Sequence, residues 1–75
     1  MSEEIRAEMV ASVLTVLVQD GATVAGGDTL VMLESMKMEI PVLTEAAGTV
    51  RTVAVAVGDT VRRGDLLAVL DTPPT

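Results

Sequence analysis

The stretch GATVAGGDTL at residues 21–30 decides the fold, because a similar stretch, GDTVRRGDLL, follows at residues 58–67. Extending the match pairs residues 8–34 with residues 45–71 at a constant offset of 37, and twelve of the 27 pairs are identical. A self-match of this length indicates two copies of one supersecondary unit. We therefore predict one domain over residues 1–75 with internal pseudo-two-fold symmetry.

Each copy has the pattern of β-structure. In the first copy, a run of Val and Thr leads to a turn at Gly21, a short strand at Thr23–Val24, a second turn at Gly27-Asp28 and a further strand; the second copy repeats these features 37 residues later. Gly suits turn positions with positive φ, and a neighbouring Asp can hydrogen-bond the turn. No stretch has a sustained helical period.

A three-residue spacing interrupts the alternation of apolar residues in each copy. It lies between Val13 and Val16 in the first copy and between Val50 and Val53 in the second. Alternation is the signature of a half-buried strand, and one extra residue shifts it to the other face. We therefore predict a β-bulge or bend at both places.

Neither copy can bury its apolar face alone, so we expect the two to pack face to face as an all-β flattened barrel or sandwich. The joining segment at residues 34–39 and the chain ends should then lie at opposite poles. Pro41 cannot donate to a strand ladder, which places it at an edge or an irregularity. We expect an ordered core at about residues 8–71, preceded by a short lead and followed by a loose tail from Thr72 that contains Pro73 and Pro74.

Composition limits the function classes. The 75 residues include no Cys and no His, which excludes disulfides and His or Cys metal ligands, and the 49% of apolar residues include no aromatic one. A net charge of −6 argues against nucleic-acid binding. No apolar run has the length of a transmembrane helix, and the charged first residues do not form a signal peptide. We expect a cytoplasmic monomer that does not bind membranes.

The segment Glu34-Ser35-Met36-Lys37-Met38-Glu39 is unusual for a hairpin, because it lacks the Gly, Asn or Asp that tight β-turns normally contain. A lysine at a hairpin tip is most often a solubilising residue. Exposed Met on both sides adds nothing to solubility, whereas flexible, polarizable Met suits recognition by a partner. An amine at a tip is open to acylation from all sides, so Lys37 is the candidate modification site.

The residues Glu34-Ser35-Met36-Lys37-Met38 resemble the attachment motif of biotinyl domains, and the run from Gly48 to Leu67 resembles the second half of the biotinyl/lipoyl fold. The similarity covers roughly residues 8–71. It is greatest to the small stand-alone biotinylated proteins of actinobacteria, which are similar to biotin carboxyl carrier protein. The short turn at residues 25–29 leaves no room for the thumb that some of these carrier proteins insert there.

The resemblance implies a carrier without catalytic or metal-binding residues of its own. Biotin protein ligase would attach biotin covalently to Lys37 and recognise Met36 and Met38, and Glu34 would help to exclude lipoyl-attaching enzymes. In the family, biotin carboxylase and carboxyltransferase subunits then use the biotin arm to carry a carboxyl group. Two alternatives stay open: a lipoyl carrier, whose sites more often read Asp-Lys-Ala, and a non-carrier structural or interaction module.

Overall fold

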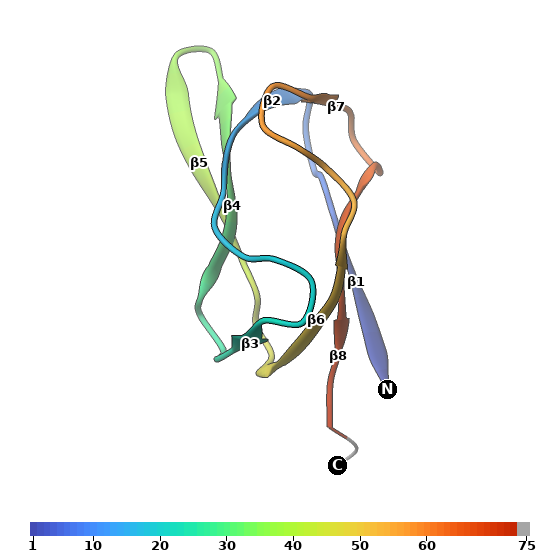
Figure 1. The fold of residues 1–75 in the computed structure, drawn as a ribbon. Helices are drawn as coiled ribbons and strands as arrows, with labels where there is room; N and C mark the ends of the chain where they lie inside the picture. The colour runs from blue at the N-terminus through green and yellow to red at the C-terminus, as the bar shows by residue number, and fades with distance from the viewer. Residues whose placement is uncertain (74–75) are drawn as a thin grey trace.

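Two four-stranded antiparallel sheets face each other in the computed structural model, which describes residues 1–73 (Figure 1). The first sheet contains, in spatial order, β1 (Ser2–Arg6), β8 (Leu66–Asp71), β6 (Gly48–Val53) and β3 (Thr23–Val24). The second contains β5 (Met38–Leu43), β4 (Thr29–Ser35), β2 (Ala11–Val16) and β7 (Thr60–Val61). The prediction of an all-β flattened barrel or sandwich is confirmed. Within the described range, no helix has the length and apolar character needed to cross a membrane.

The two copies of the repeat interlace instead of packing as separate units. The strands β1 to β4 come from the first copy and β5 to β8 from the second, and each sheet takes two strands from each copy. The expectation of face-to-face packing is therefore correct for the two sheets, but neither sheet belongs to one copy. The pseudo-two-fold axis exchanges the sheets strand for strand: β1 with β5, β8 with β4, β6 with β2 and β3 with β7.

The strand β1 corrects the predicted boundary of the ordered core. It pairs with β8, with Ser2 opposite Asp71, just as its counterpart β5 pairs with β4, with Glu39 opposite Glu34. Only one of residues 1–6 is identical to its counterpart 37 positions later, so the self-match could not reach this strand. The expected N-terminal lead is the edge strand of the first sheet, and ordered structure begins at Ser2 instead of about residue 8.

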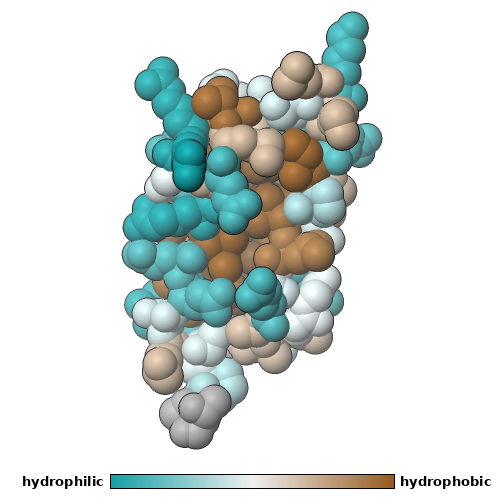
Figure 2. Space-filling view, turned by 180° about the vertical axis from the view of Figure 1, so that it is seen from behind, coloured by the Kyte–Doolittle hydropathy of each residue, from teal (hydrophilic) through white to brown (hydrophobic). Residues whose placement is uncertain are grey.

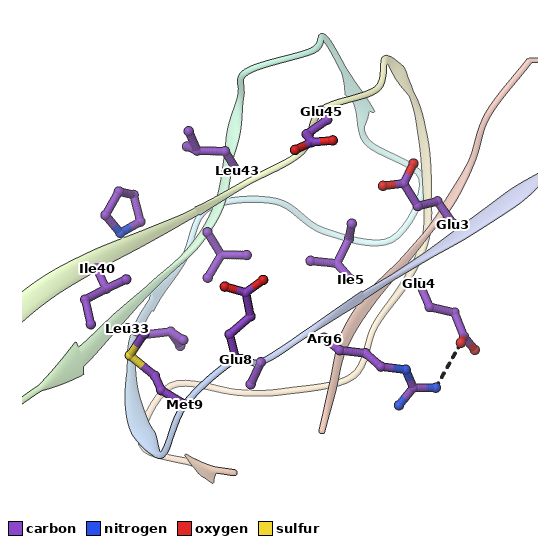
Figure 3. A pocket seen from close by; sticks show the side chains of 13 residues that line it. Glu3, Glu4, Ile5, Arg6, Glu8, Met9, Leu33, Ile40, Leu43 and Glu45 are labelled. Atoms are coloured by element: carbon purple, nitrogen blue, oxygen red, sulfur yellow. Dashed lines mark hydrogen bonds and ion pairs between the residues drawn. The ribbon is translucent and has the colours of Figure 1, made fainter. Parts of the chain in front are cut away.

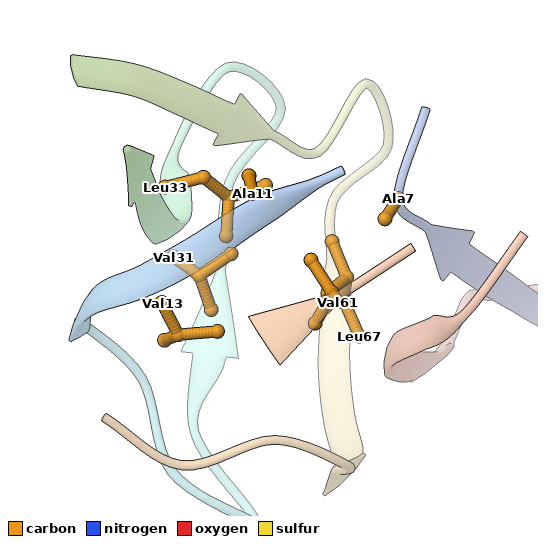
Figure 4. Close-up of a cluster of buried hydrophobic side chains, with 7 residues drawn as sticks. All are labelled: Ala7, Ala11, Val13, Val31, Leu33, Val61 and Leu67. Carbon is orange, nitrogen blue, oxygen red and sulfur yellow. The ribbon is translucent and has the colours of Figure 1, made fainter. Parts of the chain in front are cut away.

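The core consists of two apolar clusters that are related by the 37-residue offset. One cluster contains Val13, Val31 and Leu33 from the first copy with Val61 and Leu67 from the second, and Ala7 and Ala11 extend it (Figure 4). The other contains Val50, Ala68 and Leu70 from the second copy with Val24 and Leu30 from the first. Each of these side chains is at most 5% exposed. Both clusters therefore need both copies.

The tight turns have the predicted conformation. Four turns carry Gly at their third position with φ between 88° and 94°, as a type II turn requires. In three of them the fourth residue is an Asp whose carboxylate accepts a hydrogen bond from the N–H of the first residue, at 2.8 to 2.9 Å. These are Asp28 with Ala25, Asp59 with Ala56, and Asp65 with Arg62.

Both predicted irregularities are present in the central strands. The register shifts between Val13 and Thr15 in β2 and between Val50 and Thr52 in β6. Pro41 lies in β5, which is the edge strand of its sheet. The Pro therefore occupies the edge position that its missing donor predicted.

The hairpin that joins the copies and the two chain ends lie at opposite poles, as expected (Figure 1). At the lower pole, the N–H of Thr72 donates to the carbonyl of Met1 at 2.7 Å, and the Met1 amine donates to the carbonyl of Thr72 at 3.0 Å. This pair is equivalent to Ser35 and Met38 at the other pole. Thr72 is therefore held by the first residue and not loose; Pro74 lies outside the described residues.

Gly48 lies where β6 closely approaches the C-terminal end of β8. A Cβ at this position would overlap the carbonyl oxygen of Asp71 and lie 3.2 Å from its carbonyl carbon. We expect Gly48→Ala to lower the free energy of unfolding by about 1–3 kcal/mol, since the obstacle is backbone and cannot rotate away. Urea denaturation measures the change. Thr49→Ala, at an exposed neighbouring residue, is the control, and equal stability of the two variants would contradict the expectation.

Candidate functional site: the hairpin tip

The strands β4 and β5 form a hairpin with a two-residue loop. Ser35 pairs with Met38, which leaves Met36 and Lys37 as the two loop residues. Their φ angles are 54° and 64°, and no other non-glycine residue in the described range has a positive φ. Positive φ at both central residues is the requirement of a type I′ turn, the two-residue turn whose twist matches that of the flanking strands.

The loop residues are a costly choice for this turn. Asn-Gly is the preferred pair in type I′ turns, and an ordinary side chain in the left-handed region costs roughly 1–2 kcal/mol. Neither Met nor Lys has a short polar side chain that could offset this cost locally. Strain of this kind persists only where the surrounding structure enforces it, and it concentrates at functional positions. The tip residues were therefore not selected for turn stability.

All side chains at the tip are open to solvent. Met36 is 91% exposed and Met38 is 65% exposed, and Lys37 is exposed between them. The ion pairs within residues 1–73 join Arg6 to Glu4 and Arg51 to Asp71, so the Lys37 ammonium group has no intramolecular ion-pair partner among these residues. The lysine is accessible to a macromolecular partner without any rearrangement of the fold.

The stem below the tip is anchored in the core. Val31 and Leu33 of β4 belong to the first apolar cluster and are 0% and 2% exposed. Ile40 and Val42 of β5 pack against the same cluster. The hairpin is thus a rigid support whose last two residues project beyond the packed part of the domain.

The structure brings the four predicted site residues to one end of this hairpin. Met36, Lys37 and Met38 form the tip, and Glu34 lies one pair below it. Sequence reasoning had not placed Glu39 directly opposite Glu34, although a two-residue loop at positions 36 and 37 dictates this pairing. Like charges directly opposite each other cost roughly 0.2–1 kcal/mol. The two exposed carboxylates add a local negative charge next to the lysine.

The chemistry available at the tip is that of a free primary amine. Within residues 1–73, no three His, Cys, Asp or Glu side chains are grouped in a way that could hold a metal ion. The side chains of Met36, Lys37 and Met38 are exposed, so a group joined to the amine would extend into solvent. Lys37 Nζ, when unprotonated, can form an amide with an activated acyl group.

Comparison with known proteins agrees with this geometry. The family model described as biotin-requiring enzyme, which covers biotin- and lipoyl-binding domains, matches residues 3–70. The chain belongs to this biotin/lipoyl family. The match includes nearly all of β1, so the family domain begins at the N-terminal strand and not at the internal repeat.

Individual relatives come from both branches of the biotin/lipoyl family. The biotinylated protein TB7.3 homolog of Mycobacterium leprae is 62% identical over 48 residues, which cover 64% of this chain and 68% of the relative. Among solved structures, a single-chain, multi-domain long-chain acyl-CoA carboxylase matches with a TM-score of 0.90 and 31% identity over 99% of this chain. The chain spans 7% of that carboxylase. The lipoyl domain of the 2-oxoglutarate dehydrogenase complex from Azotobacter vinelandii matches with a TM-score of 0.79 and 30% identity, over 91% of this chain and 94% of that domain.

The strain at the tip can be removed by exchanging both loop residues. We expect Met36→Asn combined with Lys37→Gly to raise the free energy of unfolding of the unmodified chain by about 1–2 kcal/mol, because Asn-Gly adopts the type I′ turn with little strain. Chemical denaturation provides the measurement. Lys37→Arg keeps a long side chain at the strained position and should leave stability unchanged. A double variant no more stable than this control would show that the turn is unstrained.

Proposed function

We propose that this protein is a biotin carrier and that Lys37 is the residue to which biotin protein ligase attaches biotin. One observation carries the proposal: a lysine between two exposed methionines occupies a strained type I′ turn that projects from a rigid stem. Membership in the biotin/lipoyl family and the similarity to a relative named as a biotinylated protein support it. The same tip geometry supports a role for Lys37 as a substrate of a partner enzyme.

The attachment reaction requires little from the carrier. The unprotonated Nζ of Lys37 forms a bond to the activated carboxyl carbon of biotin, and the activating group leaves with the electron pair of the bond that breaks. Nζ releases one proton to the solvent, which completes the amide. The tip contributes access, because the exposed turn lets the ligase approach from several sides. We assign recognition by the ligase to Met36 and Met38, whose apolar side chains protrude beside the amine, and to the carboxylate of Glu34.

The arrangement of the poles suits a carrier. Lys37 lies at one pole and the chain ends at the other, and the longest dimension of the domain is 38 Å (Figure 1). A partner protein that binds the tip is therefore far from any polypeptide attached at the chain ends. Biotin attached to Lys37 would supply a ureido nitrogen able to hold a carboxyl group, and tethering would keep this group at a high local concentration.

We further propose that the partners are the biotin carboxylase and carboxyltransferase subunits of an acyl-CoA carboxylase. The similarity to a domain of a long-chain acyl-CoA carboxylase supports this class of partner. The acidic surface of the chain, with a net charge of −6, favours partners that offer a basic docking face.

A lipoyl carrier is the second candidate, and the similarity to a lipoyl domain favours it. The two functions use the same fold and the same lysine position, so the fold does not separate them. The residues next to the lysine do, because both neighbours of Lys37 are methionines, whereas lipoyl sites more often read Asp-Lys-Ala. We therefore prefer biotin.

Replacement of the lysine tests the attachment site. After coexpression with biotin protein ligase, the intact chain should gain the mass of one biotinyl group and bind streptavidin. Lys37→Arg should gain neither property while keeping the β-sheet circular dichroism spectrum of the parent chain. Biotin on the Lys37→Arg variant would place the attachment site elsewhere.

Competition between cofactors tests the choice of biotin. The unmodified chain is incubated with biotin protein ligase and biotin, or with a lipoate-attaching enzyme and lipoate, and both products are weighed by mass spectrometry. We expect modification only by the biotin enzyme. Glu34→Ala should slow biotin attachment without changing the fold. A lipoyl mass increment without any biotinyl increment would overturn the proposal.

Affinity capture tests the partner class. The biotinylated chain, captured from its own cells through a tag at the chain end and crosslinked, should retain biotin carboxylase and carboxyltransferase subunits. Lys37→Arg, which keeps the fold but lacks the arm, is the matched control. Recovery of neither subunit with the biotinylated chain would remove the carboxylase assignment and leave attachment at Lys37 unaffected.

A further inference from the structure

A groove of about 370 Å³ lies between the free edges of the two sheets, on a side of the domain that the proposed function does not use. The strand β1 borders it on one side and β5 on the other, and each of these strands is paired along only one edge. Apolar side chains gather in the middle of this molecular face, with polar side chains around them (Figure 2). The groove is therefore a place where apolar surface and unpaired strand edges meet.

The groove combines an apolar floor with three acidic side chains that are not paired to a cation (Figure 3). Ile5, Ile40 and Val42 line it and pack against the first apolar cluster below. Glu3 and Glu45 lie at one end of the groove in this view, and Glu8 extends across its middle; none of the three takes part in an ion pair within residues 1–73.

The remaining charges of the groove pair with each other. The carboxylate of Glu4 lies 2.9 Å from the guanidinium group of Arg6. The groove as a whole therefore presents three uncompensated negative charges around an apolar floor. Its electrostatic complement is a cationic segment with apolar side chains on one face.

The two free edges differ in their ability to accept another strand. Met1 and Thr72 exchange two hydrogen bonds, which fixes the direction of the backbone N–H groups that follow. Along β1 these groups point alternately toward β8 and toward the free edge, and those of Ser2 and Glu4 point to the free edge. The same alternation directs position 41 of β5 to its free edge, where Pro41 has no N–H to offer. The edge of β1 offers the outward N–H groups of Ser2 and Glu4 before the register shift between Ile5 and Arg6, whereas the edge of β5 is interrupted at Pro41.

We propose that this groove binds an extended, basic segment of a partner protein, which adds to the edge of β1 as a further strand. Alternate side chains of the segment contact Ile5, Ile40 and Val42, and its Lys or Arg residues face Glu3, Glu8 and Glu45. This is recognition by β-strand addition, in which backbone hydrogen bonds give affinity and alternate side chains give specificity. A second copy of the chain fits poorly, since its net charge is also −6. The site does not depend on the modification of Lys37.

The test uses the ¹⁵N-labelled unmodified chain and a terminally blocked peptide of alternating Lys and Val residues. Titration should give saturable NMR shifts that are confined to β1, β5 and the loop around Glu8, and binding should weaken as salt concentration rises. Combining Glu3→Gln, Glu8→Gln and Glu45→Gln should weaken binding about tenfold, because each exposed ion pair contributes roughly a factor of two. Glu39→Gln, on β5 but outside the groove, should bind the peptide as the parent chain does.

A matched pair of variants isolates the backbone contribution. Glu4→Pro removes the outward N–H of β1 together with the carboxylate, and the counterpart Pro41 shows that the fold accommodates proline at this place in the ladder. Glu4→Gln removes the carboxylate and keeps the N–H. We expect Glu4→Pro to lose peptide binding and Glu4→Gln to retain it, with an unchanged fold in both.

Several results would overturn the proposal. Equal binding of a Glu-Val peptide would remove the charge argument, and equal binding by Glu4→Pro and Glu4→Gln would remove strand addition. A dimer in sedimentation equilibrium whose groove amides shift with protein concentration would show that a second copy fills the groove. Shifts of the same amides on biotinylation of Lys37 would show that the biotin arm fills it. Failure of biotin attachment at Lys37 would leave the groove proposal intact.

Discussion

Burial of apolar side chains between the two copies of the repeat is the constraint on which the rest of the structure depends. Val13, Val31 and Leu33 form a cluster only together with Val61 and Leu67 from the other copy. The second cluster uses the corresponding positions with the copies exchanged, with Ala68 in the place of Val31. The sequence has no aromatic residue and no Cys, and residues 1–73 contain no group of side chains that could hold a metal ion, so these shared apolar clusters are the main source of stability. Neither half has a core by itself, so the two must fold as one unit.

Interlacing of the copies also explains why one lysine is presented and not two. The turn at Met36 and Lys37 joins the copies at one pole, and the hydrogen-bonded pair of Met1 and Thr72 takes its place at the other. The stem of the hairpin is anchored by buried residues of β4, which supply the packing energy that holds two non-glycine residues at positive φ. The strain is local, and the support for it comes from the whole domain.

The backbone of the two halves is symmetric, but their chemistry is not. The edge strands β1 and β5 have matching registers, yet Glu3 and Glu4 in β1 correspond to Ile40 and Pro41 in β5. One edge is therefore acidic and open, and the other is apolar and blocked by proline. Because interlacing places both edges at the same side of the sandwich, these differences combine into a single groove. The symmetric backbone places the two strand edges together, and the sequence differences between the copies give the groove its negative charge.

The sequence by itself determined the repeat, the turns, the bulges at Val13 and Val50, and the position of Lys37 at the tip. These features depend on residues close together in the chain, where Gly, Asp and the alternation of apolar residues act directly. Only the tertiary structure decided the interlaced strand order, the existence of β1 and the pairing of Thr72 with Met1. A strand such as β1 has little apolar pattern of its own and forms because β8 offers it an edge. Contacts between residues about 70 positions apart leave no local signal in the sequence.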